Sequence, residues 1–311
     1  MSGAPLSEAQ GVRERPGRFA VGVIGTGRVG SVLGAALARA GHRVVAASAV
    51  SDRSRRRAAE LLPGTPLLPP PEVASAAELL VLGVPDDVLP ELVAGLAETG
   101  LLRPGQTVLH PSGRYGIGVL DPARAAGALP LALHPVMTFT GTDVDLARLT
   151  GCSFGVTAPE AFRPIAEALV VEMGGEPEWI AEADRALYHA ALAFGANYLT
   201  TLVAQSAELL AGIGVGAPGR MLGPLLGATL DNTLRSGDAA LTGPVARGDA
   251  GTVAAHLSQL ARVAGTGSDP LVNAYLALAR LTADRALEAG LLTPDAAGRL
   301  LEVLNDDRAE S

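Results

Sequence analysis

The sequence predicts an α/β domain with a doubly wound parallel sheet, followed by an all-α domain. The chain has 311 residues, of which 48% are hydrophobic, enough for two cores of ordinary size. Short apolar runs alternate with helical patterns in the first half, as in sheets whose strands are linked by helices. After residue 182 one long helical stretch begins, and no later strand pattern is convincing. We therefore expect a disordered lead-in (1–18), a dinucleotide-binding domain (19–181), a helical domain (182–305) and a tail (306–311).

The first predicted strand ends in a turn with spaced glycines. Ala20 to Ile24 is apolar, and three spaced glycines, at positions 25, 27 and 30, follow it directly. The first glycine permits a tight turn, the second lets a pyrophosphate approach the backbone, and the third lets the next helix pack closely. The helix N-terminus would direct free N–H groups at the phosphates. The predicted cofactor contacts are Gly25, Thr26, Gly27, Arg28, Val29 and Gly30. A glycine-rich turn without a ligand is the alternative.

The second strand, expected at 44–50, leads into a run of arginines. An acidic residue about twenty positions after the first glycine would bind the ribose 2′-hydroxyl of NAD. None occurs there before Asp52, and Ser51 and Arg53 are found instead. A hydroxyl and a guanidinium suit a 2′-phosphate. We therefore expect NADP (NADPH) rather than NAD, although these arginines could also simply face water.

Further strands are expected to end at the same rim of the sheet. They lie at 79–84, 106–110 and 129–133. Because ligands of doubly wound sheets lie outside the carboxyl ends of the strands, Val84, Pro85 and Ser112 are expected to line the cofactor site. His134 would face the nicotinamide or the substrate, whereas His110 could also hydrogen-bond inside its strand. A strand at 152–157, a helix at 162–173 and a short extended piece at 178–181 complete the domain.

The long helix from residue 183 carries polar side chains on an apolar background. His189, Ala193 and Asn197 are four residues apart and therefore share nearly one helix face. A single histidine in such a helix is often a satisfied core residue, but the pair with Asn197 favours a functional face. We expect this helix to form the wall that faces the cofactor.

A second conspicuous run, LTGPVARGD, occupies residues 241–249. A turn followed by a helix N-cap at Asp249 explains its glycines, its proline and its aspartate. That explanation requires neither Thr242 nor Arg247, which are therefore candidate functional residues. His256, one turn into the following helix, belongs either to the core or to a cleft.

The composition excludes several classes of function. A formal net charge of −8 gives no general attraction to nucleic acid or to an anionic membrane surface. No run of about 18 apolar residues could span a membrane. The single cysteine, Cys152, excludes an internal disulfide and fits the cytoplasm, and we expect a small buried residue rather than a nucleophile. We expect no metal site. The sequence has no lysine, which excludes a Schiff base and a lysine proton donor.

Together these motifs resemble a family of Rossmann-like proteins in which a helical domain of unknown function follows the dinucleotide domain. The resemblance rests on the glycine turn, His134-Pro135, Tyr188-His189 with Asn197, and most specifically LTGPVARGD with His256. It covers residues 19–305. It implies an NADP-dependent oxidoreductase, similar in architecture to pyrroline-5-carboxylate reductase, ketopantoate reductase and the 6-phosphogluconate dehydrogenase superfamily. It also implies a homodimer formed through the helical domain.

One departure from these relatives affects the expected chemistry. Ketopantoate reductases and β-hydroxyacid dehydrogenases use a lysine four residues before an asparagine that Asn197 matches, and Ala193 holds that place here. We expect hydride transfer between NADPH and a C=O or C=N group of a small oxo acid or imine in the interdomain cleft. His189, His134 and His256 are candidate proton donors, Asn197 and Thr242 hydrogen-bonding groups, and Arg247 a carboxylate clamp. The alternative is an NADP-binding regulator or scaffold without turnover.

Overall fold

The computed structural model describes residues 17–264 and 270–305. The chain divides into two compact units, Met1–Ala196 and Asn197–Ser311. The division falls inside helix α8 (Arg185–Gly212), which starts shortly after the predicted domain boundary. The predicted lead-in lies almost entirely outside the described residues, as does the predicted tail.

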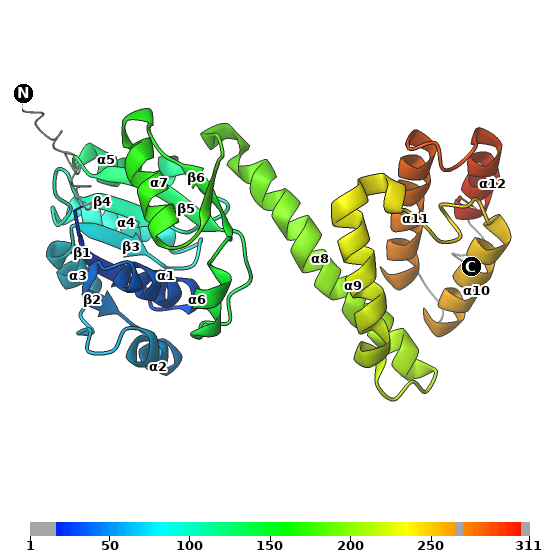
Figure 1. The fold of residues 1–311 in the computed structure, drawn as a ribbon, viewed down its shortest axis with the longest axis horizontal. Helices are drawn as coiled ribbons and strands as arrows, with labels where there is room; N and C mark the ends of the chain where they lie inside the picture. The colour runs from blue at the N-terminus through cyan, green and yellow to red at the C-terminus, as the bar shows by residue number, and fades with distance from the viewer. Residues whose placement is uncertain (1–16, 265–269, 306–311) are drawn as a thin grey trace, which may run out of the picture. The chain divides into compact units, whose positions relative to one another are not determined.

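A seven-stranded sheet forms the centre of the first unit (Figure 1). Its strand order is β2-β1-β3-β4-β5-β6-β7, and neighbouring strands are parallel except β5 and β6, which are antiparallel. The strands are β1 (Ala20–Ile24), β2 (Arg43–Ser48), β3 (Leu79–Leu82), β4 (Thr107–His110), β5 (Leu129–Pro135), β6 (Ser153–Thr157) and β7 (Glu176–Trp179). The chain places β2 on one side of β1 and then β3 on the other, so the order of the strands reverses at β1. The predicted doubly wound α/β fold is confirmed.

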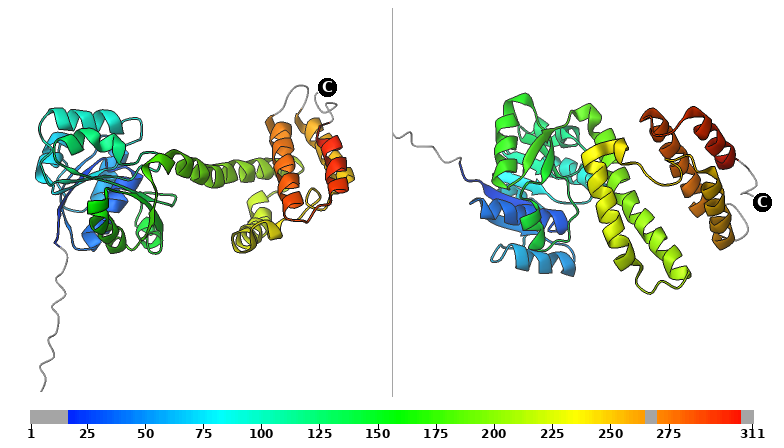
Figure 2. Two further views of the ribbon diagram at one scale, coloured as in Figure 1. Left: turned by 90° about the horizontal axis from the view of Figure 1, so that it is seen from above. Right: turned by 45° about the vertical axis from the view of Figure 1, so that its right-hand side comes forward.

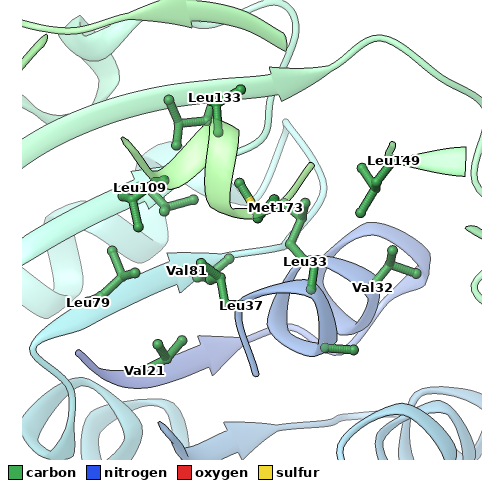
Figure 3. Packing of buried hydrophobic residues seen from close by; sticks show 14 of the residues in the cluster. Val21, Val32, Leu33, Leu37, Leu79, Val81, Leu109, Leu133, Leu149 and Met173 are labelled. Atoms are coloured by element: carbon green, nitrogen blue, oxygen red, sulfur yellow. The ribbon is translucent and has the colours of Figure 1, made fainter. Parts of the chain in front are cut away.

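Helices cover both faces of this sheet because successive strand residues point to opposite sides. One face packs on α1 (Arg28–Arg39), α6 (Val144–Arg148) and α7 (Arg163–Glu172), and the other on α3 (Pro70–Ala76), α4 (Leu89–Glu98) and α5 (Asp121–Ala125). Helix α2 (Asp52–Leu61) follows β2 and packs on α1. In Figure 3, Leu79 and Val81 of β3 lie near Leu33 and Leu37 of α1. The neighbouring residue Leu80 belongs to the core on the opposite face.

The second unit consists of helices and their connections and has no strand in its described residues. It holds the remainder of α8, α9 (Pro218–Ser236), α10 (Ala250–Ala264), α11 (Pro270–Glu288) and α12 (Pro294–Leu304). Helices α10 to α12 lie side by side around one core that includes Val253, Ala283 and Leu300 (Figure 2). The predicted all-α region is confirmed. In the described part of the chain, no helix is both long enough and apolar enough to cross a membrane.

Candidate functional site

The glycine turn joins β1 to α1 at the carboxyl edge of the sheet. Gly25 has a φ of +90°, and a Cβ atom on Gly30 would lie 2.2 Å from the Gly25 carbonyl oxygen. Gly83, after β3, packs on the same turn, because its Cβ would lie 2.6 Å from the Gly30 Cα. A Cβ on Gly27, in contrast, would be 3.7 Å from its nearest neighbour, the Gly83 carbonyl oxygen. The protein's own packing therefore requires Gly25 and Gly30, whereas it does not require Gly27, whose open side would admit a ligand.

Helix α1 begins at this turn without a side-chain cap. Its N-cap residue, Gly27, makes no side-chain cap hydrogen bond. The amides of Arg28, Val29 and Gly30 lie in the first turn, where a helix offers no backbone acceptor. Unpaired N–H groups at the positive end of the helix dipole are the groups that bind phosphate. These residues therefore fit the pyrophosphate of a dinucleotide.

Thr26 is directed away from this edge. Its buried hydroxyl donates to the carbonyl oxygens of Ser48 and Ser54 at 3.1 and 3.2 Å. Its N–H also donates to the Ser48 carbonyl oxygen, at 3.0 Å. Thr26 thus links the turn to β2 and α2. Its N–H and hydroxyl hydrogens are already donated inside the protein, so any contact with a cofactor would involve its other atoms.

The arginine run forms the first two turns of α2. Ser51 is its N-cap, in a reciprocal capping box with Ser54. Arg55 donates to the Val50 carbonyl oxygen at 3.0 Å and pairs with Asp52 at 3.5 Å. Arg53 is exposed and, within the described residues, makes no hydrogen bond or ion pair. Of the two arginines, Arg53 is therefore the one whose guanidinium is available to a 2′-phosphate.

The sheet register brings other predicted residues into one row. Ile24 pairs with Leu82, Val81 with Leu109, and Leu109 with Leu131. Because parallel strands end at the same edge of a sheet, the segments that follow β1, β3 and β4, with Gly27, Val84, Pro85 and Ser112, leave the sheet at one edge, where His134 of β5 also lies. Adjacent strands are about 4.8 Å apart, so the row spans about 14 Å from the strand of Gly27 to that of His134. One extended ligand could contact the whole row.

His110, at the end of β4, is fully buried and hydrogen-bonded on both ring nitrogens. Nε2 lies 2.8 Å from the Gly116 carbonyl oxygen, and Nδ1 accepts from the Ser112 N–H at 3.2 Å. Because a carbonyl oxygen can only accept, the single proton of the neutral ring is on Nε2. Burial lowers the pKa of His110 to about 4. His110 thus follows the predicted alternative in which its ring hydrogen-bonds inside the protein. These hydrogen bonds hold the loop from Ser112 to Gly116.

His134, Tyr188 and His189 form a cluster where β5 meets the start of α8. The Tyr188 hydroxyl lies 2.7 Å from His134 Nδ1, and the ring centroids of His134 and His189 are 6.4 Å apart. A Cβ on Gly113 would lie 2.8 Å from His189 Cδ2 and 2.9 Å from His134 Nε2. A Cβ on Gly155 would lie 2.3 Å from the Tyr188 hydroxyl oxygen. Two glycines therefore make room for the three rings.

Arg185, one turn before Tyr188 and His189, lies buried beside this cluster and is only 2% exposed. Its Nε donates to the Thr157 hydroxyl at 2.7 Å, and its Nη2 donates to the carbonyl oxygens of Ala132 and Gly155 at 3.1 and 3.0 Å. Its Nη1 is also buried and, among the described residues, has no hydrogen-bond partner. The guanidinium carbon is 5.6 Å from the centre of the Tyr188 ring. A positive charge is thus held close to the tyrosine.

The surroundings shift the protonation of both members of the His134–Tyr188 pair. The pKa of His134 is lowered to about 4, chiefly by burial and in addition by its charged neighbour Arg185 and by His189. Burial raises the pKa of Tyr188, an effect that the Arg185 charge and a hydrogen bond from the Gly155 backbone partly offset. At neutral pH the imidazole is therefore neutral and the phenol is protonated.

The remaining predicted catalytic residues belong to the second unit. The LTGPVARGD run forms a turn in which Ala246 is buried, and a Cβ on Gly248 (φ +72°) would lie 2.7 Å from the Ala296 Cβ. Asp249 accepts a hydrogen bond from the Thr252 N–H at 3.0 Å, which confirms the predicted N-cap. Thr242 and Arg247 are exposed, so the turn does not need either side chain for packing.

The other two, Asn197 and His256, are also exposed. His256 Nδ1 lies 2.9 Å from the Tyr275 hydroxyl, within the second unit. Of the six predicted catalytic residues, only His134 and His189 are shown in contact with each other. The described residues contain no group of three or more His, Cys, Asp or Glu side chains that could hold a metal ion.

Comparison with known protein families agrees with this architecture. A model of a Rossmann-like domain matches residues 4–135, and a model of a domain of unknown function, DUF2520, matches residues 152–282. No curated protein matches the chain. The predicted resemblance to a Rossmann-like family with a helical domain of unknown function is therefore confirmed.

Solved structures share the fold at low sequence identity. A Bacteroides fragilis protein, assigned provisionally as an NADP oxidoreductase, is 23% identical with a TM-score of 0.71, over 86% of this chain and 98% of that one. A Myxococcus stipitatus imine reductase variant in complex with NAD⁺ is 17% identical with a TM-score of 0.58, over 92% and 100%. Plasmodium falciparum pyrroline carboxylate reductase with NADP bound is 13% identical with a TM-score of 0.53, over 91% and 100%. At these identities the similarity establishes the fold.

Proposed function

Since the chain combines a Rossmann-like domain with a DUF2520 domain, we propose that it is an NADP-dependent reductase. It would transfer a hydride from NADPH to a C=O or C=N group of a small substrate such as an oxo acid or an imine. One observation supports this most directly: an uncapped helix N-terminus and a histidine–tyrosine cluster lie along the same row of strand ends. A dinucleotide bound at the first would extend toward the second.

Different residues of this row would bind different parts of the cofactor. Gly27 and the first-turn amides of α1 would hold the pyrophosphate, and Ser51 with Arg53 the 2′-phosphate. Val84, Pro85 and Ser112 would line the path toward the nicotinamide. When bound, the dihydronicotinamide supplies the hydride, and the protein supplies orientation and electrostatics.

The proton and the substrate contacts must come from side chains. His134 and His189 stand at the far end of the row, and reduction of a carbonyl needs a proton donor and stabilisation of the developing negative charge. We assign substrate binding to Asn197, Thr242, Arg247 and His256 of the helical domain, with the Arg247 guanidinium as a clamp for a carboxylate. The exposure of Thr242 and Arg247, which the LTGPVARGD turn does not use for packing, supports this assignment.

We further propose a cytoplasmic homodimer formed through the helical domain. Many large apolar side chains of α8 and α9 are exposed, including Leu202 at 43%, Leu225 at 63% and Leu234 at 79%. Such faces are usually covered by a partner. Light scattering after size-exclusion chromatography should give twice the mass of the chain, and a monomer at micromolar concentration would contradict the proposal.

Cofactor binding is tested by titrating the purified protein with NADPH and with NADH. We expect a preference for NADPH that shrinks in Arg53→Ala. Gly27→Ala should weaken NADPH binding about tenfold or more, because its methyl group clashes with no protein atom and would enter the pyrophosphate site. The matched control is Gly95→Ala in α4, where a Cβ would have no neighbour within 4 Å. Equal wild-type affinities for the two nucleotides would contradict the 2′-phosphate assignment.

Turnover is tested separately, by following NADPH oxidation with a panel of oxo acids and cyclic imines. Reduction of at least one class supports the reductase. Tight NADPH binding without any consumption would instead favour the regulator or scaffold, the alternative that the missing lysine at Ala193 leaves open.

A further inference from the structure

We infer that His134 and Tyr188 form a proton relay, in which His134 gives a proton to the substrate and Tyr188 replaces it. The inference rests on the proposed reductase function and assigns the source of its proton. Its geometric basis is the distance of 2.7 Å between the Tyr188 hydroxyl oxygen and His134 Nδ1. Both residues are needed, because the His134 ring faces the loop after β4 and the Tyr188 hydroxyl supplies the proton that replaces the one His134 gives up.

The surroundings of His134 fix the direction of the relay. The Tyr188 hydroxyl can donate to Nδ1, and the single proton of the neutral ring is then on Nε2. Among the described residues, Nε2 has no hydrogen-bond partner. It lies 2.9 Å from the position that a Cβ on Gly113 would take, so this edge of the ring packs directly against the Gly113 backbone. The ring thus presents an N–H toward the loop that follows β4.

The step balances without a charged imidazole. A bound dihydronicotinamide would supply the hydride to the substrate carbon and be oxidised to the nicotinamide, and the electron pair of the C=O or C=N bond would move to the heteroatom. That atom takes the proton from His134 Nε2, while Nδ1 takes the proton of the Tyr188 hydroxyl. The imidazole ends as the other neutral tautomer and Tyr188 as a phenolate, which water then reprotonates.

The groups that face this pair favour such a route. The Arg185 guanidinium adds positive charge beside His134, which disfavours an imidazolium, and His189 and fully buried His110 are further neighbours. Arg185 and the Gly155 backbone N–H stabilise a phenolate at Tyr188, whereas the Cys152 thiol acts weakly in the opposite direction. Glu182 faces Arg185, but both of its carboxylate oxygens accept hydrogen bonds, from the N–H groups of Ile117 and Gly118 at 2.7 and 3.0 Å. Arg185 is therefore a positioning residue for the relay.

The relay is tested first without cofactor, by ¹⁵N NMR of imidazole-labelled full-length protein. The sequence has only five histidines, so His134 can be assigned by comparison with His134→Gln. We expect the Nε2–H tautomer in the wild type and a mixture of tautomers in Tyr188→Phe, which lacks the hydroxyl. A wild-type Nδ1–H tautomer would overturn the inference, because the histidine would then be donating to the tyrosine.

A second cofactor-free measurement isolates Arg185. Spectrophotometric titration of tyrosine ionisation, with Tyr188→Phe subtracted, should show a higher midpoint for Tyr188 in Arg185→Met than in the wild type. An unchanged midpoint would remove Arg185 from the relay. If Arg185→Met fails to fold, Thr157→Val is the second variant, because it removes one hydrogen bond to Arg185 but keeps the Arg185 charge. The midpoint of Tyr188 ionisation in Thr157→Val should stay close to that of the wild type. A large rise would contradict a charge effect.

Turnover separates this inference from the proposed function. With NADPH and a reducible substrate, Tyr188→Phe should lower kcat about 100-fold or more while NADPH affinity is retained. Tyr198→Phe, in the same helix, is the matched control and should keep its activity. If the wild type turns over and Tyr188→Phe turns over equally fast, only the relay fails. If the wild type reduces nothing, the reductase proposal fails, and the relay fails with it.

Discussion

Replacing His110 with glutamine should flatten the dependence of stability on pH in the first unit. In the folded protein, His110 is fully buried and neutral, with its Nε2–H donated to the Gly116 carbonyl oxygen. Protonating it would place a second proton on Nδ1, which now accepts from the Ser112 N–H. Glutamine keeps one donor and one acceptor but does not titrate. The variant therefore removes the charge change and keeps the polarity.

The size of the effect follows from the shift itself. Burial lowers the pKa of His110 from 6.5 to about 4. The unfolded chain therefore binds a proton at a higher pH than the folded chain, and stability must fall as the pH drops through this interval. The contribution of His110 is complete above a pH of about 6.5 and is lost on the way down to about 4. At 1.36 kcal/mol per pH unit, the loss at pH 5 amounts to about 2 kcal/mol.

The single tryptophan makes the measurement specific. Trp179 lies in β7, so denaturant unfolding followed by its fluorescence reports on the first unit. Unfolding free energies of the wild type and of His110→Gln are compared at pH 7 and pH 5. We expect the wild type to lose about 2 kcal/mol more than the variant.

Ser112→Ala is the control for this comparison. It removes the acceptor of the Tyr115 N–H in the same loop and leaves His110 in place. It should therefore lower stability by about 1 kcal/mol equally at both pH values. Equal losses in the wild type and in His110→Gln would refute the argument, because a histidine that titrates alike in both states contributes no pH dependence.

Two glycine substitutions test the packing of each unit. Gly30→Ala should destabilise the first unit by about 3 kcal/mol, because the new methyl group would lie 2.2 Å from the Gly25 carbonyl oxygen. Thermal unfolding followed by Trp179 fluorescence checks it, and an unchanged midpoint would contradict the close approach of α1 to β1. Gly248→Ala should destabilise the second unit by about 2 kcal/mol, because its φ is +72° and its methyl group would meet Ala296. Circular dichroism at a helix wavelength measures this loss, and Arg247→Ala should leave the transition in place.

The sheet could be predicted from the sequence because its signals are local. The central parallel strands β1, β3, β4 and β5 are short, mainly apolar runs that are buried on both faces, and a turn or a helical pattern follows each of them. Three short helices were not predicted: α3, α5 and α6. The start of α3 is Pro70-Pro71, which suggests a connection, yet proline is tolerated in the first turn of a helix, where its missing N–H would have no partner.

Only part of the candidate site could be predicted from the sequence. His134 follows a predicted strand and His189 lies on the long helix, so each could be found from its own surroundings. Tyr188 and Arg185 gain their roles only when α8 packs on β5 and β6, and periodicity does not report that contact. Gly155 was the available signal, because a glycine inside a predicted strand often marks the close approach of another group.

The missing lysine can be understood from the charges in this cluster. A lysine can bring a positive charge and a transferable proton on the same atom, whereas an arginine keeps its proton throughout the physiological pH range. Arg185 therefore supplies a positive charge that cannot itself be the acid. Because that charge disfavours an imidazolium at His134, an acid in this cluster must start neutral and become negative, which a phenol can do. The Arg185 charge thus makes His134 a weaker base and Tyr188 a stronger acid than each would be without it. For that reason Tyr188 can supply the proton that a neutral His134 passes on.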